Sequence, residues 1–156
     1  MKIKLTILIL LASLIFTLAF EWDTPEFIEL YNAINDTRSM YGLTQLRPDT
    51  YLTEVAQGRA EDMAVNGYFK HLSYGLVRQI KQDTREQNGL DSKVYIGEIL
   101  ARGKVCNKPD QFVGAWLGSY SHRNCMLDSK FGFVKIGIGI AEKDGKKIIV
   151  VLFANQ

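Results

Sequence analysis

The sequence predicts an α+β fold, a three-layer α-β-α sandwich with a C-terminal antiparallel hairpin in its central sheet. Apolar residues recur at helical spacing over the first part of the chain, residues from 134 onward resemble two strands joined by a tight turn, and the last strand is apolar almost throughout. Such a strand must be covered on both faces, so helices are expected on both sides of the sheet. With 47% hydrophobic and 23% charged residues, the 156-residue chain has the composition of one globular domain, assigned to residues 24–155.

Residues 1–19 differ from the rest of the chain and resemble a secretory signal peptide. Lys2 and Lys4 precede an apolar run from Leu5 to Phe16, and Thr17-Leu18-Ala19 offers small residues to a signal peptidase. The run is shorter than the roughly 20 residues of a spanning helix, so cleavage is expected, with a retained membrane anchor as the alternative. No cysteine follows the run, so a lipoprotein anchor is not indicated. The predicted location is therefore secreted or extracytoplasmic.

The net positive charge of the chain lies in this leader. Without Lys2 and Lys4 the basic residues fall from 19 to 17, which equals the number of acidic residues. A neutral mature chain argues against nucleic acid as a partner. Membrane contact is expected only through the leader, if it is retained.

Two amphipathic helices should follow the leader. Thr24-Pro25 supplies an N-cap and a first helical residue for one, which should end near Tyr41-Gly42. Asp49 or Thr50 can cap the second helix, and Asn66-Gly67 should end it.

Arg59 lies among the inward-facing apolar residues of the second helix, and its guanidinium should reach an acidic partner. The aromatic-rich segment Tyr68–Ser73 is expected to be a loop pinned by its rings. A shorter helix should run from about Leu76 to Gln87, followed by a short strand or extended segment from Val94 to Leu100.

A broadly apolar helix is predicted between Pro109 and a polar turn at Ser121–Cys125. Proline suits its first turn, and the neighbouring Asp110 favours the positive end of the helix dipole. Trp116 and Tyr120 could line a ligand groove. Aromatic residues at helical spacing usually belong to the core, however, and we expect both to be buried.

The C-terminal strands carry two specific signals. Gly137 and Gly139 leave one face of the first strand almost bare, which allows a helix or a neighbouring backbone to approach closely. Asp144-Gly145 is typical of a two-residue hairpin turn. Lys147–Ala154 is the continuous apolar run that predicts cover on both faces.

The two cysteines, Cys106 and Cys125, would meet an oxidising environment after export, which favours a disulfide. They flank the helix that begins near Pro109, and about 11 helical residues hold its ends about 16 Å apart. Both flanking segments would have to fold back for a bridge to form. A disulfide and two buried thiols therefore both remain open.

His71, Glu98 and His122 supply two imidazoles and one carboxylate, the ligand set of a zinc centre that keeps a fourth position for water or substrate. Spacing does not fix their geometry, because no His-Glu-x-x-His helix is present. In the alternative, each histidine hydrogen-bonds a carbonyl or carboxylate and only ties loops together.

The order of several short motifs is similar to that of the CAP, or SCP-like, superfamily, which includes cysteine-rich secretory, antigen-five and plant pathogenesis-related proteins. The resemblance runs from about Thr24 to Phe153, and its Ser-x-x-His-Arg segment is similar to the bacterial branch. The matching segments are Ile34–Arg38, Leu43–Leu46, Leu52–Met63, Phe69–His71, Gly97–Ile99, Trp116–Ser119, Ser121–Arg123 and Ile136–Gly139.

The resemblance implies an α-β-α sandwich with a surface cleft, where two histidines and two glutamates of many members hold a divalent metal. His71 corresponds to the first histidine and Glu98 to the glutamate of a Gly-Glu-Asn motif, in which Ile99 replaces the asparagine. Ser119 lines the cleft at the place of the second glutamate, and His122 is the candidate second histidine. With a single carboxylate, zinc should bind more weakly than in members with both glutamates.

Three hypotheses remain for the function. The first is a secreted binding module whose cleft engages a protein, a lipid or an envelope component, with Zn²⁺ as a possible cofactor. The alternative is a metal-dependent hydrolase outside the cytoplasm, and the third is a domain with a structural role alone. Ser119 and the missing asparagine favour the first, because hydrolysis needs a precisely held base and metal.

Overall fold

The computed structural model describes residues 24–89, 93–128 and 130–156, so the predicted leader lies outside the described residues. In chain order, the helices and strands are α2 (Pro25–Met40), β1 (Arg47–Pro48), α3 (Thr50–Asn66), α4 (Tyr74–Asn88), β2 (Ile96–Lys104), α5 (Pro109–Gly118), α6 (Tyr120–Met126), β3 (Lys135–Lys143) and β4 (Lys146–Ala154).

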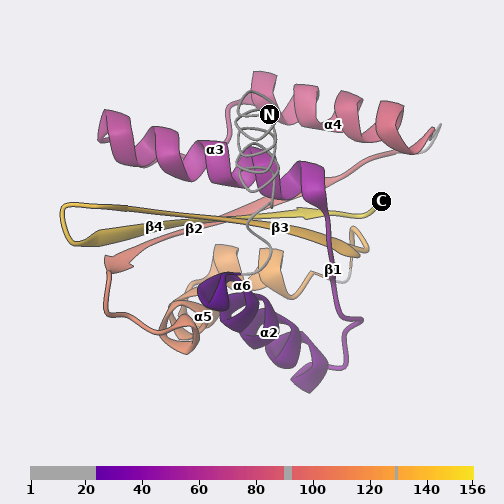
Figure 1. The fold of residues 1–156 in the computed structure, drawn as a ribbon. Helices are drawn as coiled ribbons and strands as arrows, with labels where there is room; N and C mark the ends of the chain where they lie inside the picture. Colours follow the sequence, from indigo (N-terminus) through magenta and orange to yellow (C-terminus); the bar gives the residue numbers. More distant parts are fainter. Residues whose placement is uncertain (1–23, 90–92, 129) are drawn as a thin grey trace, which may run out of the picture.

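The elements form three layers, which confirms the predicted α+β sandwich. Helices α3 and α4 cover one face of the sheet, while α2, α5 and α6 cover the other (Figure 1). The four-stranded sheet has the order β1-β3-β4-β2, with β1 parallel to β3 and the other pairs antiparallel. The C-terminal hairpin is therefore its centre, and β2 is an edge strand.

Each face of the sheet has its own apolar core. Phe27, Leu30, Trp116 and Met126 belong to the core under α2, α5 and α6, whereas Leu52, Ala56, Met63 and Ile80 belong to the core under α3 and α4. Strand β4 contributes to both cores and is buried from Lys147 to Ala154. The prediction that this strand is covered on both faces is confirmed.

The glycines of β3 let α3 approach the sheet closely. A Cβ atom on Gly137 would lie 2.2 Å from the carbonyl carbon of Leu52, and one on Gly139 would lie 2.2 Å from the carbonyl carbon of Ala56. No side chain fits at these distances, so the predicted close approach is confirmed.

Most predicted element ends are also confirmed. Thr24 and Asp49 cap α2 and α3 through their side chains, and Gly67 and Gly89 close α3 and α4 in the left-handed conformation. Asp144 and Gly145 have φ values of 52° and 69°, as the predicted two-residue hairpin turn requires.

The segment after α5 was predicted incorrectly. Residues 121–125, expected as a polar turn, belong to helix α6, which begins after an extended residue at Ser119. The change of direction at Ser119 also separates the two aromatic residues. Trp116 is buried as expected, but Tyr120 is 75% exposed, so its prediction as a core residue was wrong.

The edge of the sheet differs from the prediction in two places. β2 begins at Ile96 and continues to Lys104, beyond the predicted end at Leu100. Arg47–Pro48, expected as part of a turn, forms the short parallel strand β1 beside β3. The short strand β1 forms by pairing with β3, and β2 continues to Lys104 by pairing with β4. These partners are distant in the sequence, so the local residue pattern does not predict the pairing.

Both cysteines are free thiols in the structure, although the sequence left a disulfide open. Cys106 is exposed beyond the end of β2. Cys125 on α6 is partly buried, and burial raises the pKa of its thiol to about 12. These environments predict very different reactivities, because the thiolate is the reactive form.

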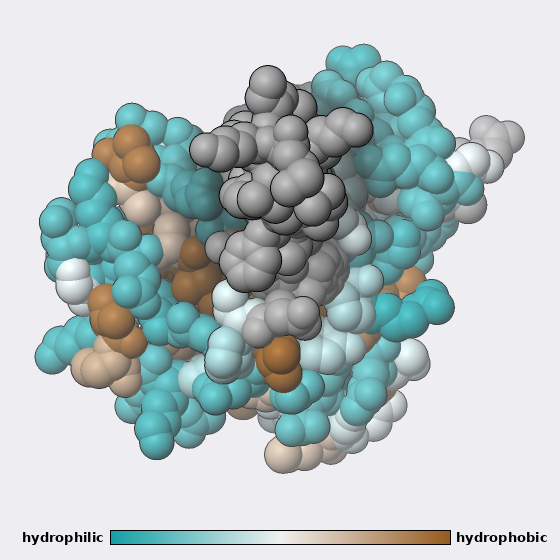
Figure 2. Space-filling model, in the orientation of Figure 1, coloured by the Kyte–Doolittle hydropathy of each residue, from teal (hydrophilic) through white to brown (hydrophobic). Residues whose placement is uncertain are grey.

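The face shown in Figure 2 is mostly hydrophilic over α4, and its apolar residues form small, separate patches. Among the described residues, no helix combines the length and hydropathy needed to cross a membrane.

Gly139→Ala is expected to lower the free energy of unfolding by about 2 kcal/mol or more, because its Cβ would meet the backbone of α3. Gly114→Ala is the matched control, since a Cβ there meets nothing within 4 Å in the middle of α5. It should stabilise the protein by about 0.5–1 kcal/mol. Urea unfolding of both variants measures these changes in the free energy of unfolding. Equal changes in the two variants would contradict the close approach of α3 to Gly139.

Ellman's reagent should modify one cysteine of the native protein quickly and the second only after unfolding. Cys106→Ser should remove the fast reaction and leave the slow one. If the unreduced, denatured protein shows no thiol that reacts with Ellman's reagent, the two cysteines are joined in a disulfide. That result would contradict the two free thiols of the structure.

Candidate functional site

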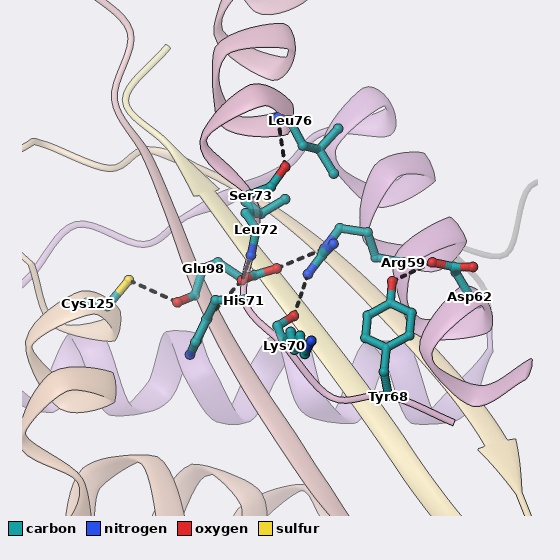
Figure 3. Close-up of polar contacts among 10 residues, drawn as sticks. All are labelled: Arg59, Asp62, Tyr68, Lys70, His71, Leu72, Ser73, Leu76, Glu98 and Cys125. Carbon is teal, nitrogen blue, oxygen red and sulfur yellow. Dashed lines mark hydrogen bonds and ion pairs between the residues drawn. The ribbon is translucent and has the colours of Figure 1, made fainter. Parts of the chain in front are cut away.

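Glu98 on β2 carries the buried carboxylate around which the candidate site is built. Its side chain is only 5% exposed. Oε1 accepts a hydrogen bond from Arg59 Nε at 2.9 Å, and Oε2 lies 2.8 Å from both the backbone nitrogen of Leu72 and His71 Nδ1 (Figure 3). The predicted acidic partner of Arg59 is therefore Glu98. A buried carboxylate needs such donors, because an uncompensated charge in the interior is costly.

The same contacts fix the loop between α3 and α4. Arg59 donates a second hydrogen bond, from Nη2 to the carbonyl oxygen of Lys70 at 2.9 Å. Ser73 ends the loop by capping α4, where its side chain accepts a hydrogen bond from the backbone of Leu76 (Figure 3). The rings of the loop also hold it, as predicted, because Tyr68 and Phe69 pack against the core under α3 and α4. Phe69 in addition stacks on the guanidinium of Arg102, with the ring centroid 4.4 Å away.

The contact with Glu98 defines the tautomer of His71. Arg59 and Leu72 both donate to the carboxylate, which therefore serves as an acceptor, and His71 must donate through Nδ1–H. In the neutral ring this leaves the lone pair on Nε2. Because the His71 side chain is 59% exposed, that nitrogen is available at the surface.

His122 lies beside His71, although the two come from opposite layers of the sandwich. Their ring centroids are 6.0 Å apart, with an interplanar angle of 41°. His71 belongs to the loop before α4 and His122 to α6, which contacts β2 from the other layer. Burial lowers the pKa of His122 below its ordinary value, and the nearby charge of a protonated His71 lowers it further.

Two side-chain hydrogen bonds position the helices of the layer that contains α6. The buried guanidinium of Arg38 on α2 donates through Nη1 to the carbonyl oxygen of Met126 at 2.7 Å. Trp116 on α5 donates its indole N–H to the carbonyl oxygen of Leu100 on β2 at 2.9 Å. Arg38 thus joins α2 to α6, which carries His122, and Trp116 joins α5, the helix directly before α6, to the strand that carries Glu98.

Ser119 lies just before α6 and is half-buried. Its hydroxyl lies 3.4 Å from that of Ser121, and no hydrogen bond among the described residues joins it to His71, Glu98 or His122. The structure thus brings His71, Glu98 and His122 together and leaves Ser119 outside their contacts.

The three side chains do not play equivalent roles. Both oxygens of Glu98 are engaged by protein donors, so this residue orients His71. Within residues 24–89, 93–128 and 130–156, no three His, Cys, Asp or Glu side chains are grouped to hold a metal ion. Sequence reasoning missed the backbone donor of Leu72, for which the sequence carries no signal.

The model of the cysteine-rich secretory protein family, CAP, matches residues 31–153. The chain is also similar to the uncharacterized membrane protein YlbC of Bacillus subtilis (strain 168). The two are 34% identical over 120 residues, which cover 76% of this chain and 31% of YlbC. The chain thus spans about a third of the length of this relative.

Several solved structures resemble the fold. An outer surface protein from Borrelia burgdorferi has a TM-score of 0.63 and 28% identity, covering 81% of this chain and 90% of that one. An extracellular protein containing a SCP domain, from Bacillus anthracis, has a TM-score of 0.61 and 25% identity, covering 81% of this chain and 39% of that one.

Proposed function

The chain belongs to the cysteine-rich secretory protein family, CAP, and from this premise we propose that it is an extracytoplasmic binding domain whose ligand site is the histidine pair. One observation carries the proposal. Buried Glu98 fixes the ring of the exposed His71, whose centroid lies 6.0 Å from that of His122.

The proposed location rests on the leader and on the relatives. Lys2 and Lys4 followed by the run from Leu5 to Phe16 have the order of a secretory signal peptide. Two structural neighbours are described as an outer surface protein and an extracellular protein. Export would place the histidine pair outside the cytoplasm.

The proposed ligand is a divalent transition metal such as Zn²⁺, bound by two imidazoles. The 6.0 Å between the two ring centroids is close to the roughly 5 Å expected for two imidazoles that share one tetrahedral zinc. A carboxylate that accepts from the other nitrogen of a metal-binding histidine is the usual supporting arrangement, which Glu98 supplies. The lowered pKa of His122 favours the neutral ring that metals require.

These residues fit an open metal site better than a closed structural one. Two protein donors leave further coordination positions for water or for a donor group of a bound partner. Metal affinity should accordingly be lower than at sites with three or four protein ligands. The role of this chain is to hold one imidazole rigidly and present both at the surface.

The geometry supports the alternative, a metal-dependent hydrolase, less well. A general base needs an oxygen within hydrogen-bond reach of the attacking water. Glu98 directs both oxygens to Arg59, His71 and the backbone of Leu72, and its side chain is buried. It would have to give up one of these contacts to act as the base.

Calorimetric titration with Zn²⁺ should show one site per chain. His71→Ala and His122→Ala should each weaken binding at least tenfold, because the chain has only these two histidines. Glu98→Gln should weaken binding about tenfold without abolishing it, as expected for a residue that supports a ligand. Ser119→Ala is the matched control and should bind zinc like the wild type.

Equal zinc binding by the wild type and both histidine variants would contradict the shared site. Zinc-dependent turnover of an ester, peptide or glycan substrate, lost in Glu98→Gln, would instead favour the hydrolase.

A further inference from the structure

Helix α4 exposes most of its surface to solvent. Only Ile80 and Thr84 of its 15 residues are buried, and the surface over the helix is hydrophilic (Figure 2). The helix lies in the layer of α3, on the opposite side of the sheet from α2, α5 and α6 (Figure 1). Its outer face is therefore available to a partner.

Three cations and one aromatic ring form a row along this outer face. Tyr74, Arg78, Lys81 and Arg85 occur at i, i+4, i+7 and i+11, the spacing of neighbours along one side of a helix. All four line one hollow of about 300 Å³. We call them the cationic row, which extends about 16 Å along the helix axis at 1.5 Å per residue.

The protein does not neutralise the cations of the row. Within the described ranges, Arg78, Lys81 and Arg85 form no ion pair within 4.0 Å. Like charges three and four residues apart on a helix repel each other and destabilise it. An anion placed between these side chains would relieve the repulsion, so the row favours a negatively charged partner.

The two acidic residues of α4 do not line the hollow beside the row. Asp83 accepts hydrogen bonds from Tyr51 on α3 and from Gln79. Glu86 accepts a hydrogen bond from Gln82. Both carboxylates are thus engaged elsewhere, and the hollow keeps its positive charge.

The positive surface continues from the row toward β2. The ammonium groups of Lys81 and Lys93 lie 6.0 and 5.3 Å from the centroid of the Tyr95 ring, so both flank the same ring. Lys93 forms no ion pair within 4.0 Å in the described part of the chain. The cations therefore form an extended surface, which fits a partner with repeated negative charges.

We propose that the cationic row binds an anionic polysaccharide, with its sulfate or carboxylate groups at the cations and one sugar ring against Tyr74. The guanidinium groups of Arg78 and Arg85 can bind such anions through two parallel hydrogen bonds. Tyr74 is 86% exposed, and its ring offers apolar surface to the C–H face of a sugar. The choice of a polysaccharide among polyanions rests on Tyr74 and on the proposed location outside the cytoplasm.

Calorimetry of the full chain with a heparin oligosaccharide long enough to span the row tests this proposal. Heparin should bind at least tenfold more tightly than a neutral dextran of equal length, with affinity that falls as salt is added. Arg78→Gln combined with Arg85→Gln should weaken binding at least tenfold, and Tyr74→Ala should weaken it about threefold. The matched control, Lys104→Gln combined with Lys146→Gln, removes two exposed cations that face each other across β2 and β4, and it should change nothing.

Polygalacturonate, which carries carboxylates without sulfates, identifies the anionic group. Tighter binding of heparin would assign the sulfate, and tighter binding of polygalacturonate would assign the carboxylate. Either order supports the proposal if the double arginine variant weakens the binding. Unchanged far-ultraviolet circular dichroism of that variant excludes unfolding of α4 as the cause.

Equal heparin binding by the wild type and the double arginine variant would overturn the proposal. An equal loss in the lysine control would also overturn it, by showing attraction to positive charge anywhere on the surface. Polyphosphate or single-stranded DNA binding as tightly as heparin would contradict the choice of a polysaccharide. The zinc titration is independent of these results, because none of the substituted residues contacts the histidine pair.

Discussion

The candidate site depends on the hydrogen bonds that the protein supplies to one buried carboxylate. Glu98 is nearly excluded from water, so its charge requires donors supplied by the protein. Arg59, the backbone of Leu72 and Nδ1 of His71 provide them from α3 and from the loop before α4. Satisfying this single charge therefore fixes the distance between β2 and α3, the path of the loop and the orientation of an exposed imidazole. The geometry of the site follows from an electrostatic requirement of the interior.

The packing of the sandwich determines whether these donors can reach Glu98. Gly137 and Gly139 bring the backbone of α3 directly onto β3, which sets the height of Arg59 above the sheet. In the opposite layer, Arg38 and Trp116 hold α6 and α5 through backbone carbonyls and so place His122. The two imidazoles meet at the edge strand β2 because each layer is fixed independently against the same sheet. This dependence gives the glycines a role in the site as well as in the core.

Much of the fold could be predicted from the sequence because its signals are local. Caps, the Asp144-Gly145 turn and the bare face of β3 each depend on a few adjacent residues. The site was less predictable, since Arg59 and Glu98 are 39 residues apart and spacing alone does not distinguish a metal ligand from a residue that orients one. Residues 121–125 were missed as a helix because Ser119, Ser121 and Asn124 are typical of turns. Tyr120 lies outside the core because the chain changes direction at Ser119.

The central claim is that Glu98 fixes His71 with its proton on Nδ1 and its lone pair on Nε2, facing solvent beside His122. Long-range ¹H–¹⁵N correlation spectra of the histidine rings at about pH 8, above the ordinary histidine pKa of about 6.5, report this tautomer directly. The account predicts that neutral His71 is protonated on Nδ1 in the wild-type protein. A spectrum showing His71 protonated on Nε2, with Nδ1 bare, would contradict the hydrogen bond to Glu98 and the site built on it.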